Sequence, residues 1–566
     1  MKLILKEYLA SLKEREELDA LLPDLLSQMG LNVISKPGRG TRQFGVDIAA
    51  VGKINGGPEK VYLLSVKSGD LGRKDWNSGS VQDLQPSLDD ILTVYIPTHI
   101  PTEHKDKPIA ICICMGGDIK EEVRISLSQY EKSKITDKVE FEIWDGDRLS
   151  SMVENNFLQE DLLPQGMRPL LRKSLALLDE PQASFKYFSE LVKSLSSASF
   201  KKNADRLTAM RQMNICLWIL FAWARDIDNM ESAYLSSERV VLHAWELCKK
   251  QFHKKTKIAQ SMQLTYSGIV GTYQEISGQY LSKVVIPHAS KMHGLSSSVR
   301  SSESLDVNLK LFDLLSRLSI AGLWSYWSLG LFAKDDENTE QIKEQVKLYT
   351  KTLKLLISNN PILFLPAKDS QAIDIFLAML FLSFDGSNEE DCIKWLTEMH
   401  NRIVFSYEVN GAYPCIYDDY NQLILHPENG SDEYKKDATS ASILYPTMGL
   451  WAALLKNKKL YELAQKAFED NFSHCNYQFW YVGNTSEDHL YINDQSHGAS
   501  LSHLPINLSE DEFLDVVWDE CDQSDNYKKL SCFKNGLWPL LLIACRHYRL
   551  PVPVNFTLGY RDKNFE

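Results

Sequence analysis

The chain has few of the features that identify secreted, zinc-binding or membrane-spanning proteins. It contains ten cysteines in 566 residues, but no CxxC pair and no Cys/His spacing typical of a zinc site. The apolar stretch within Met1–Glu7 is too short for a signal peptide. The most apolar helical run, 213–224, is 12 residues long, whereas a membrane span needs about 20. These absences predict a cytoplasmic protein without membrane contact, with reduced and mostly buried thiols and a buried helix at 213–224.

Positive charge and nucleotide-binding motifs are also scarce. The chain has 62 Lys and Arg against 75 Asp and Glu, a net charge of −13. This balance excludes a basic nucleic-acid coat, so any DNA contact requires a local basic patch on an acidic body. No GxxxxGK[ST] motif occurs, which indicates that the chain is not itself an NTPase.

The length and the hydrophobic pattern predict more than one domain. A chain of 566 residues is too long for one compact core. Up to about residue 160, short β-rich runs alternate with helical patterns, and beyond about 165 the pattern is almost continuously helical. We therefore expect an α/β domain at 1–160 and a large all-α region at 165–566, with a possible sub-boundary near 400–440. Within that region, 475–510 is expected to be loop or partly extended.

The first region can be divided into individual elements. Helices are expected at 14–29, 81–92, 119–132 and from 147 to 155, and strands at 31–35, 44–51, 59–67, 108–115 and 139–144. The turn Asn55-Gly56-Gly57-Pro58 joins two of these strands in a predicted hairpin. This order of elements indicates one sheet flanked by helices.

Two charged residues lie on the predicted hairpin strands, where small or apolar residues surround them. Side chains alternate across a strand, so Asp47 shares a face with Gly45 and Ala49 while Val46 and Ile48 point into the core. Asp47 and Lys67 then converge at one end of the sheet. The pair suits metal-assisted phosphodiester hydrolysis, in which Asp47 holds Mg²⁺ (or Mn²⁺) and Lys67 orients or deprotonates water or stabilises the transition state. A structural ion pair at a sheet edge is the alternative interpretation.

These residues, in this order, resemble a known family. An amphipathic helix, a strand, Gly45-Val46-Asp47-Ile48, a hairpin and Ser65-Val66-Lys67-Ser68-Gly69 are similar to the core of the PD-(D/E)XK nucleases, and most of all to the Mrr-like and prokaryotic defence-associated branches. The resemblance covers residues 10–95 and extends to 1–160 as one domain. It implies a restriction-endonuclease-like fold, with Asp47 as metal ligand, Lys67 as catalytic lysine and Val66 as donor of a backbone carbonyl to the metal.

The chain departs from the family pattern at Ser65. The family usually carries Glu, Asp or Gln at this position as a metal ligand, and a hydroxyl is a weaker ligand. Either another carboxylate substitutes or the metal affinity is low. Family members often supply a carboxylate from the first helix, where Glu17 is the first candidate and Asp19 the second. Gln82 and Gln85, in the helix that follows the lysine strand, resemble polar residues that line the site in this family.

Basic side chains cluster in sequence around the hairpin. Lys36, Arg39 and Arg42 precede Asp47, and Arg73 and Lys74 follow Lys67. On an acidic protein such a cluster suits a phosphate backbone, with Gln82 as a further contact, although a solvated loop is the alternative interpretation. Trp76 is placed to stack on a base or sugar.

Two other groups of residues are expected to be ordinary structural residues. Cys112 and Cys114 fall on one face of a strand, where small buried residues are common. The histidines 474, 489, 497 and 503 lie near Asp488 and Asp494, but their spacing matches no metal-ligand pattern.

The function predicted from the sequence is a Mg²⁺-dependent deoxyribonuclease acting in prokaryotic restriction or anti-phage defence. Its helical region would sense a trigger, form a homo-oligomer or dock a partner sensor or ATPase protein. A catalytically inactive nuclease-fold scaffold that binds nucleic acid is one alternative, and an RNA-directed nuclease is another.

Overall fold

The computed structural model divides the chain into two compact units. Unit 1 comprises Met1–Leu195 with Arg211–Ala233, and unit 2 comprises Ser196–Met210 with Tyr234–Glu566. The structure describes residues 6, 9–10, 12, 14, 18–35, 44–80, 83–156, 167–197, 200–299, 301–331, 337–426 and 430–562. The boundary predicted at 160–165 lies outside these residues.

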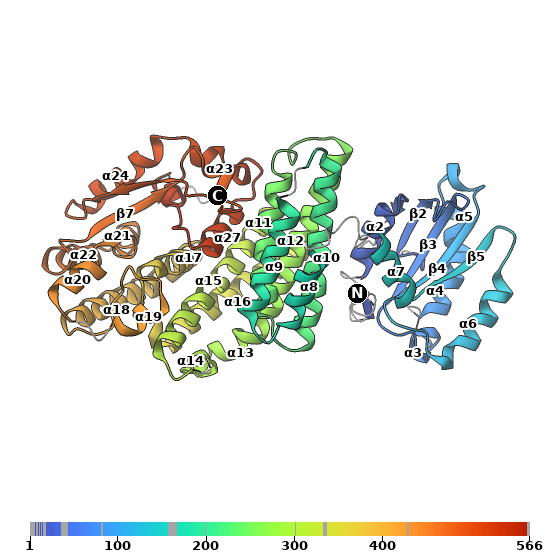
Figure 1. Ribbon diagram of the computed structural model, residues 1–566, viewed down its shortest axis with the longest axis horizontal. Coiled ribbons are helices and arrows are strands. Elements are labelled where there is room, and N and C mark those ends of the chain that lie inside the picture. The colour runs from blue at the N-terminus through green and yellow to red at the C-terminus, as the bar shows by residue number, and fades with distance from the viewer. Residues whose placement is uncertain are drawn as a thin grey trace. The chain divides into compact units, whose positions relative to one another are not determined.

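Unit 1 is built on a mixed five-stranded sheet (Figure 1). Its strands, in spatial and chain order, are β1 (Asn32–Ser35), β2 (Ile48–Gly52), β3 (Lys60–Lys67), β4 (Ile109–Met115) and β5 (Val139–Trp144). The pairs β1–β2 and β2–β3 are antiparallel, whereas β3–β4 and β4–β5 are parallel. The predicted mixed α/β sheet is therefore confirmed.

Unit 1 also contains helices before, between and after these strands. They are α2 (Asp19–Gln28), α3 (Arg73–Trp76), α4 (Leu84–Asp90), α5 (Ile96–His99), α6 (Glu121–Lys134), α7 (Gly146–Asn156), α8 (Met167–Ala176) and most of α9 (Pro181–Ser196). One face of the sheet contributes Ala49 and Leu63 to a core completed by Leu88 of α4 and Leu127 of α6. The α2 helix lies against β1 and β2 and contacts α7. Six consecutive residues of β3 are buried, as expected for a strand covered on both faces.

The remaining chain is predominantly helical. The helices that run through both units are α10 (Asn203–Asp226) and α11 (Glu231–Cys248). The long helices of unit 2 are α12 (Lys257–Val284), α15 (Ser304–Leu329), α16 (Glu337–Asn359), α17 (Ala372–Ser383), α18 (Glu389–Glu408), α21 (Leu444–Leu454), α22 (Lys458–Asp470), α24 (Glu510–Asp522) and α27 (Pro539–Tyr548). Its short helices are α13 (Ile286–Ala289), α14 (Gly294–Ser298), α19 (Tyr420–Leu425), α20 (Asp432–Ala438), α23 (Ser486–His489), α25 (Asn526–Lys529), α26 (Ser531–Lys534) and α28 (Leu558–Asp562).

Unit 2 also contains a small sheet, so the expectation of an all-α region needs correction. Its strands are β6 (Ala441–Ser442), β7 (Asn476–Tyr481) and β8 (Ala499–Ser502), with β7 in the centre. In β7 the side chains of Tyr477, Phe479 and Tyr481 are buried, in the alternation typical of a strand with one covered face. Two of these strands lie in 475–510, the segment predicted to be partly extended.

Predictions about the apolar run and the thiols are borne out. The run 213–224 lies inside α10, where Leu217, Leu220 and Phe221 are fully buried. All ten cysteines are buried and free of disulfides. Within the described residues, no helix combines the length and hydropathy that a membrane span requires.

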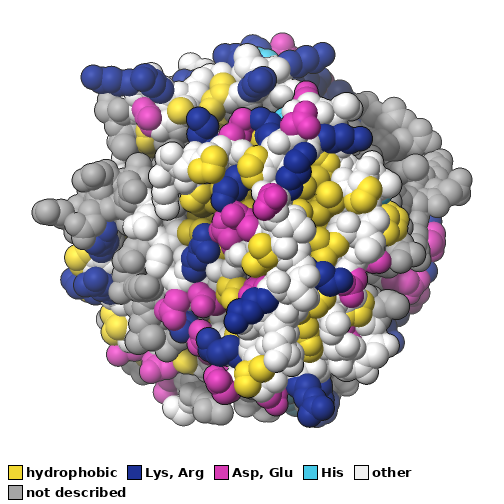
Figure 2. All heavy atoms as spheres, turned by 90° about the vertical axis from the view of Figure 1, so that its right-hand side faces the viewer, with side chains coloured by type: hydrophobic (Ala, Val, Ile, Leu, Met, Phe, Trp, Pro, Cys, Tyr) yellow, Lys and Arg dark blue, Asp and Glu magenta, His cyan; other side chains and the backbone are white. Residues whose placement is uncertain are grey.

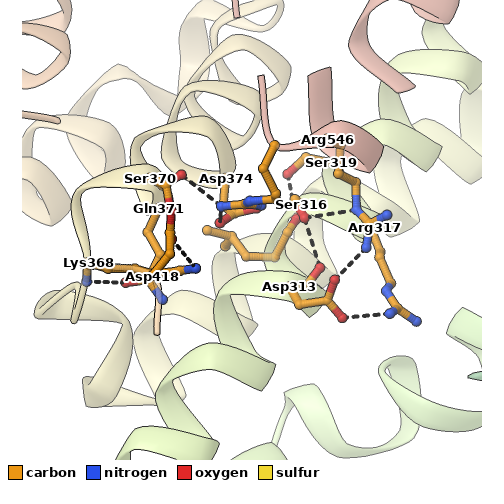
Figure 3. A network of polar contacts seen from close by, with 12 residues as sticks. Asp313, Ser316, Arg317, Ser319, Lys368, Ser370, Gln371, Asp374, Asp418 and Arg546 are labelled. Carbon is orange, nitrogen blue, oxygen red and sulfur yellow. Dashed lines mark hydrogen bonds and ion pairs between the residues drawn. The ribbon is translucent and has the colours of Figure 1, made fainter. Parts of the chain in front are cut away.

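A buried ionic network joins three helices of unit 2 (Figure 3). Arg546 of α27 donates a bifurcated hydrogen bond of 2.6 Å to the carboxylate of Glu238 in α11. It also pairs with Asp313 of α15 and donates 3.1 Å from Nε to Ser316 Oγ. Arg317 pairs with the same Asp313 at 2.7 Å. Burial opposes ionisation of Glu238, but the guanidinium of Arg546 lowers the pKa of that carboxyl below its usual range.

Candidate active site

Asp47 lies directly before β2, an interior strand of the sheet, and its carboxylate is hydrogen-bonded to the neighbouring strand. The Val66 N–H donates to Asp47 Oδ2 over 2.8 Å, and the Asp47 N–H donates to the Leu64 carbonyl over 2.9 Å. Since β2 and β3 are both flanked by other strands, Asp47 and Lys67 lie at strand ends and not at an edge of the sheet. This carboxylate is only half-buried, so solvent reaches it.

The expected alternation of side chains fails just before β2. Val46 belongs to the same buried core cluster as Ala49, although residues three apart in a regular strand point to opposite faces. Leu64, which is the pairing partner of Ile48, also accepts the N–H of Asp47, so the ladder is irregular at this point. Burial raises the pKa of the Cys114 thiol, and the nearby Asp47 carboxylate raises it further. Val46 is buried in the core, as the sequence predicts, but the predicted alternation, with Ala49 on the face opposite Val46, does not hold.

Glu14 is the site residue that the sequence reasoning missed. The Lys67 Nζ lies 3.5 Å from Glu14 Oε2, and the lysine side chain is only 15% exposed. Glu14 opens the predicted helix 14–29, but helix rotation decides which acidic residue reaches the sheet, and rotation cannot be deduced from sequence. The predicted ligand Glu17 lies outside the described residues. Asp19, the second candidate, is the first residue of α2.

Four charged residues act on one another at this strand end, and we refer to Glu14, Asp19, Asp47 and Lys67 as the Asp47 cluster. Burial raises the pKa of Asp47 to about 6, and the Val66 N–H opposes this shift. Glu14 raises the pKa further, Lys67 lowers it, and Asp19 raises it slightly. Among the described residues of this cluster, ionised Asp47 thus faces two carboxylates and one ammonium group, an imbalance that a cation relieves.

Ser65 lies within β3 and is 1% exposed. Because side chains alternate along the strand, it shares a face with Leu63, which belongs to the buried core cluster, and with Lys67. The role of Ser65 in the site stays a prediction. Val66 contacts Asp47 through its N–H, and its proposed role as carbonyl donor stays a prediction.

The predicted basic contacts are only partly within the described structure. Lys36, Arg39, Arg42 and Gln82 lie outside the described residues. Arg73 and Lys74 are exposed in α3. Figure 2, which views unit 1 from the side of α5, α6 and β5, shows lysine and arginine side chains interspersed with acidic ones and with apolar stretches.

Two residues near α3 and α4 behave differently from a nucleic-acid contact. Trp76 is 8% exposed and meets the Tyr130 ring edge-on at 5.7 Å between centroids, so the prediction that it stacks on a base is wrong. Gln85 accepts a hydrogen bond of 2.9 Å from the Asn77 side chain. These contacts join α3 to α6 and the end of α3 to α4.

The donor set of the Asp47 cluster suits a hard cation only in part. Within the described residues, no group of three or more His, Cys, Asp or Glu side chains is arranged to hold a metal ion. The Glu14 carboxylate acts electrostatically on the Asp47 carboxylate and raises its pKa. Mg²⁺ is commonly bound by one or two carboxylates, with water and substrate phosphate completing its shell. Asp47 and Glu14 are carboxylates of the kind that this mode of binding uses.

Three of the histidines of unit 2 have ordinary polar partners, and His489 is the last residue of α23 rather than a loop residue. His489 Nδ1 lies 2.8 Å from Asp494, and His497 Nδ1 lies 3.2 Å from Ser486 Oγ. His474 bonds the Thr439 hydroxyl.

Comparison with known proteins adds no assignment to this geometry. No protein-family model, no curated protein and no solved structure matches the chain.

The raised pKa of Asp47 predicts that its ionised carboxylate lowers the free energy of unfolding at neutral pH. Its folded pKa of about 6 exceeds the unfolded value of about 3.9. The folded chain therefore holds the proton more tightly, and stability declines as pH rises from about 4 to 6. Asp47→Asn keeps an oxygen acceptor for the Val66 N–H but carries no charge. We expect it to be more stable than the wild type at pH 8 by about 1–2 kcal/mol, and equal to it below pH 4.

Urea unfolding of both proteins between pH 4 and pH 8 measures this difference. Asp106→Asn, at an exposed position of unit 1, is the matched control and should leave the wild-type profile unchanged. An Asp47→Asn protein that is less stable than the wild type at pH 8 would show that the carboxylate serves only to hold the strand ladder.

Proposed function

We propose that unit 1 is a metal-dependent deoxyribonuclease of the PD-(D/E)XK type. The observation that carries the proposal is the Asp47 cluster: a half-buried carboxylate at the end of an interior strand, with a raised pKa, beside Glu14 and a largely buried Lys67. The order of β2, β3 and the lysine at the end of β3 agrees with the resemblance of the sequence to that superfamily.

The residues of the cluster have distinct roles in this proposal. Asp47 and Glu14, with the Val66 carbonyl, would hold Mg²⁺, which lowers the pKa of a bound water and neutralises charge on the phosphate. Lys67 stabilises the negative charge that develops on the phosphate oxygens. Glu14, 3.5 Å from the ammonium, orients Lys67 toward the same strand end. Asp19 adds to the negative potential that favours a divalent ion.

Cleavage by a Lys67→Met variant tests the proposed role of the ammonium. Methionine preserves most of the length of the side chain but cannot stabilise an oxyanion. We expect cleavage of supercoiled plasmid in Mg²⁺ to fall by about 10²–10³-fold, with DNA binding reduced much less. EDTA should abolish the wild-type activity. Lys53→Met, in the turn after β2, is the control and should cleave like the wild type.

The inactive scaffold is the second candidate, and one observation favours it: within the described residues, no group of three or more His, Cys, Asp or Glu side chains is arranged to hold a metal ion. Binding of DNA without any metal-dependent cleavage by the wild type would establish the scaffold and overturn the nuclease. Parallel RNA substrates distinguish the RNA-directed alternative.

The proposed effector role in prokaryotic defence requires more than one copy or a partner. Each chain supplies one Asp47 cluster, and cutting both strands of a duplex is commonly done by two copies of a one-site nuclease. Light scattering with and without DNA tests this point. A monomer in both states, together with double-strand cleavage, would contradict the homo-oligomer.

A further inference from the structure

A strongly basic loop connects α11 and α12 in unit 2 and has no part in the Asp47 cluster. Residues 249–257 read Lys-Lys-Gln-Phe-His-Lys-Lys-Thr-Lys, and the chain has no acidic residue between Glu246 and Glu275. We refer to 249–257 as the basic loop. On a protein with a net charge of −13, five lysines in nine residues are a marked local reversal of sign.

The lysines of the basic loop divide into one buried anchor and four exposed cations. Lys249 is 4% exposed and pairs with Glu246 at 2.7 Å and with Glu487 at 3.4 Å. The other lysines, Lys250, Lys254, Lys255 and Lys257, are exposed, as is His253. Within the described part of the chain, no ion pair joins Lys254, Lys255 or Lys257 to an acidic side chain. The nearby carboxylates of Glu246 and Glu487 thus pair with Lys249. The exposed ammonium groups of the loop are therefore accessible to a partner outside the chain.

The loop is held in a defined conformation. The Phe252 ring packs edge-on against Trp245 at 5.0 Å and against Tyr266 at 5.9 Å between centroids. Gln263 donates from its side chain to the Phe252 and Lys254 carbonyls. A backbone turn closes from Lys254 N to Gln251 O at 2.9 Å. The exposed lysines are therefore presented by a preorganised loop, which reduces the entropy lost on binding.

We propose that the basic loop binds the phosphate backbone of double-stranded DNA as a second contact outside the cleavage site. Compact ammonium groups bind phosphates without reading sequence. A membrane surface fits less well, because insertion into the lipid interface requires exposed apolar side chains, and the only apolar residue of the loop, Phe252, packs against Trp245 and Tyr266. The proposal takes the identity of the polyanion from the proposed function but does not require cleavage. Figure 1 shows the two helices that the loop joins.

Fluorescence polarisation with a labelled duplex of about 30 base pairs in EDTA tests this proposal on the full chain. The variant is Lys254→Gln/Lys255→Gln/Lys257→Gln. We expect its Kd to rise about tenfold or more at about 100 mM salt, and the slope of log Kd against log salt to fall by about 2–3. The matched control, Lys343→Gln/Lys347→Gln/Lys394→Gln, removes the same charge from lysines already paired with glutamates in α16 and α18, and should bind almost as the wild type does.

Three results would overturn the inference. The loop variant could bind DNA with unchanged Kd and salt slope, or the control could lose as much affinity as the loop variant. Loop-dependent binding to vesicles of about 30% phosphatidylserine in phosphatidylcholine, with no loop effect on DNA, would assign the loop to a lipid surface instead. The same measurement in an Asp47→Asn background separates the two proposals. Loop-dependent binding without cleavage by the wild type refutes only the nuclease, and cleavage with loop-independent binding refutes only the loop.

Discussion

Asp47→Asn is expected to reduce metal-dependent DNA cleavage by at least about 10³-fold while the protein stays folded. The amide keeps an acceptor for the Val66 N–H, which lies 2.8 Å from the carboxylate, so the strand end is preserved. It removes the negative charge that would hold the cation. Burial disfavours this charge and raises the pKa of Asp47 to about 6. The variant should therefore lose activity and at the same time have a larger free energy of unfolding than the wild type.

Gel assays of plasmid nicking and linearisation in Mg²⁺ and in Mn²⁺ measure the loss. Asp106→Asn is again the control, since it removes one exposed carboxylate from the same unit. Glu14→Gln should also lower activity, because it removes the second proposed carboxylate ligand and the charge that orients Lys67. Cleavage by Asp47→Asn within tenfold of the wild type, at equal protein stability, would remove Asp47 from the reaction.

Arg546→Met is expected to destabilise unit 2 by about 3–5 kcal/mol. The arginine pairs with Glu238, whose side chain is fully buried, and with Asp313. Without the guanidinium, Glu238 loses its main counter-charge inside the helical core, whereas Asp313 keeps its ion pair with Arg317. The loss of stability is expected to be large because the Glu238 carboxylate that remains is charged and cannot reach water. The strength of the ion pair itself is not the reason.

A double variant separates these two causes. Arg546→Met/Glu238→Leu removes both charges and should recover most of the stability lost in the single variant. Arg561→Met, which breaks an exposed pair with Asp522, should cost less than about 1 kcal/mol. Urea unfolding followed by tryptophan fluorescence reports the order of the four proteins. A single Arg546→Met variant as stable as Arg561→Met would contradict the structural role of the network in Figure 3.

The strands of unit 1 were predictable because their pattern is local. The apolar runs and the Gly-Gly-Pro turn at 56–58 mark β2 and β3, and the run 108–115 marks β4. The ends of the strands were less predictable, since Asp47 donates to a carbonyl of another strand and shifts the alternation there. The two-residue β6 is too short to carry a pattern.

The site was predictable where it depended on residue type and not where it depended on orientation. Asp47 and Lys67 are charges in runs of small or apolar residues, and this contrast is visible in the sequence. Glu14 was missed because the rotation of the helix about its own axis decides which of several acidic side chains faces the sheet. The spacing of Ser65 from Lys67 places both on one face of β3, but the burial of Ser65 depends on the helices packed there and is not visible in the strand itself.

Divalent-ion binding tests the central claim most directly. Electron paramagnetic resonance can follow Mn²⁺ added to the protein with a non-cleavable phosphorothioate duplex. The account predicts that the wild type and Asp106→Asn bind Mn²⁺ alike and that Asp47→Asn and Glu14→Gln bind it much more weakly. Equal Mn²⁺ binding by wild type and Asp47→Asn, or no binding by the wild type, would contradict a metal site at the Asp47 cluster.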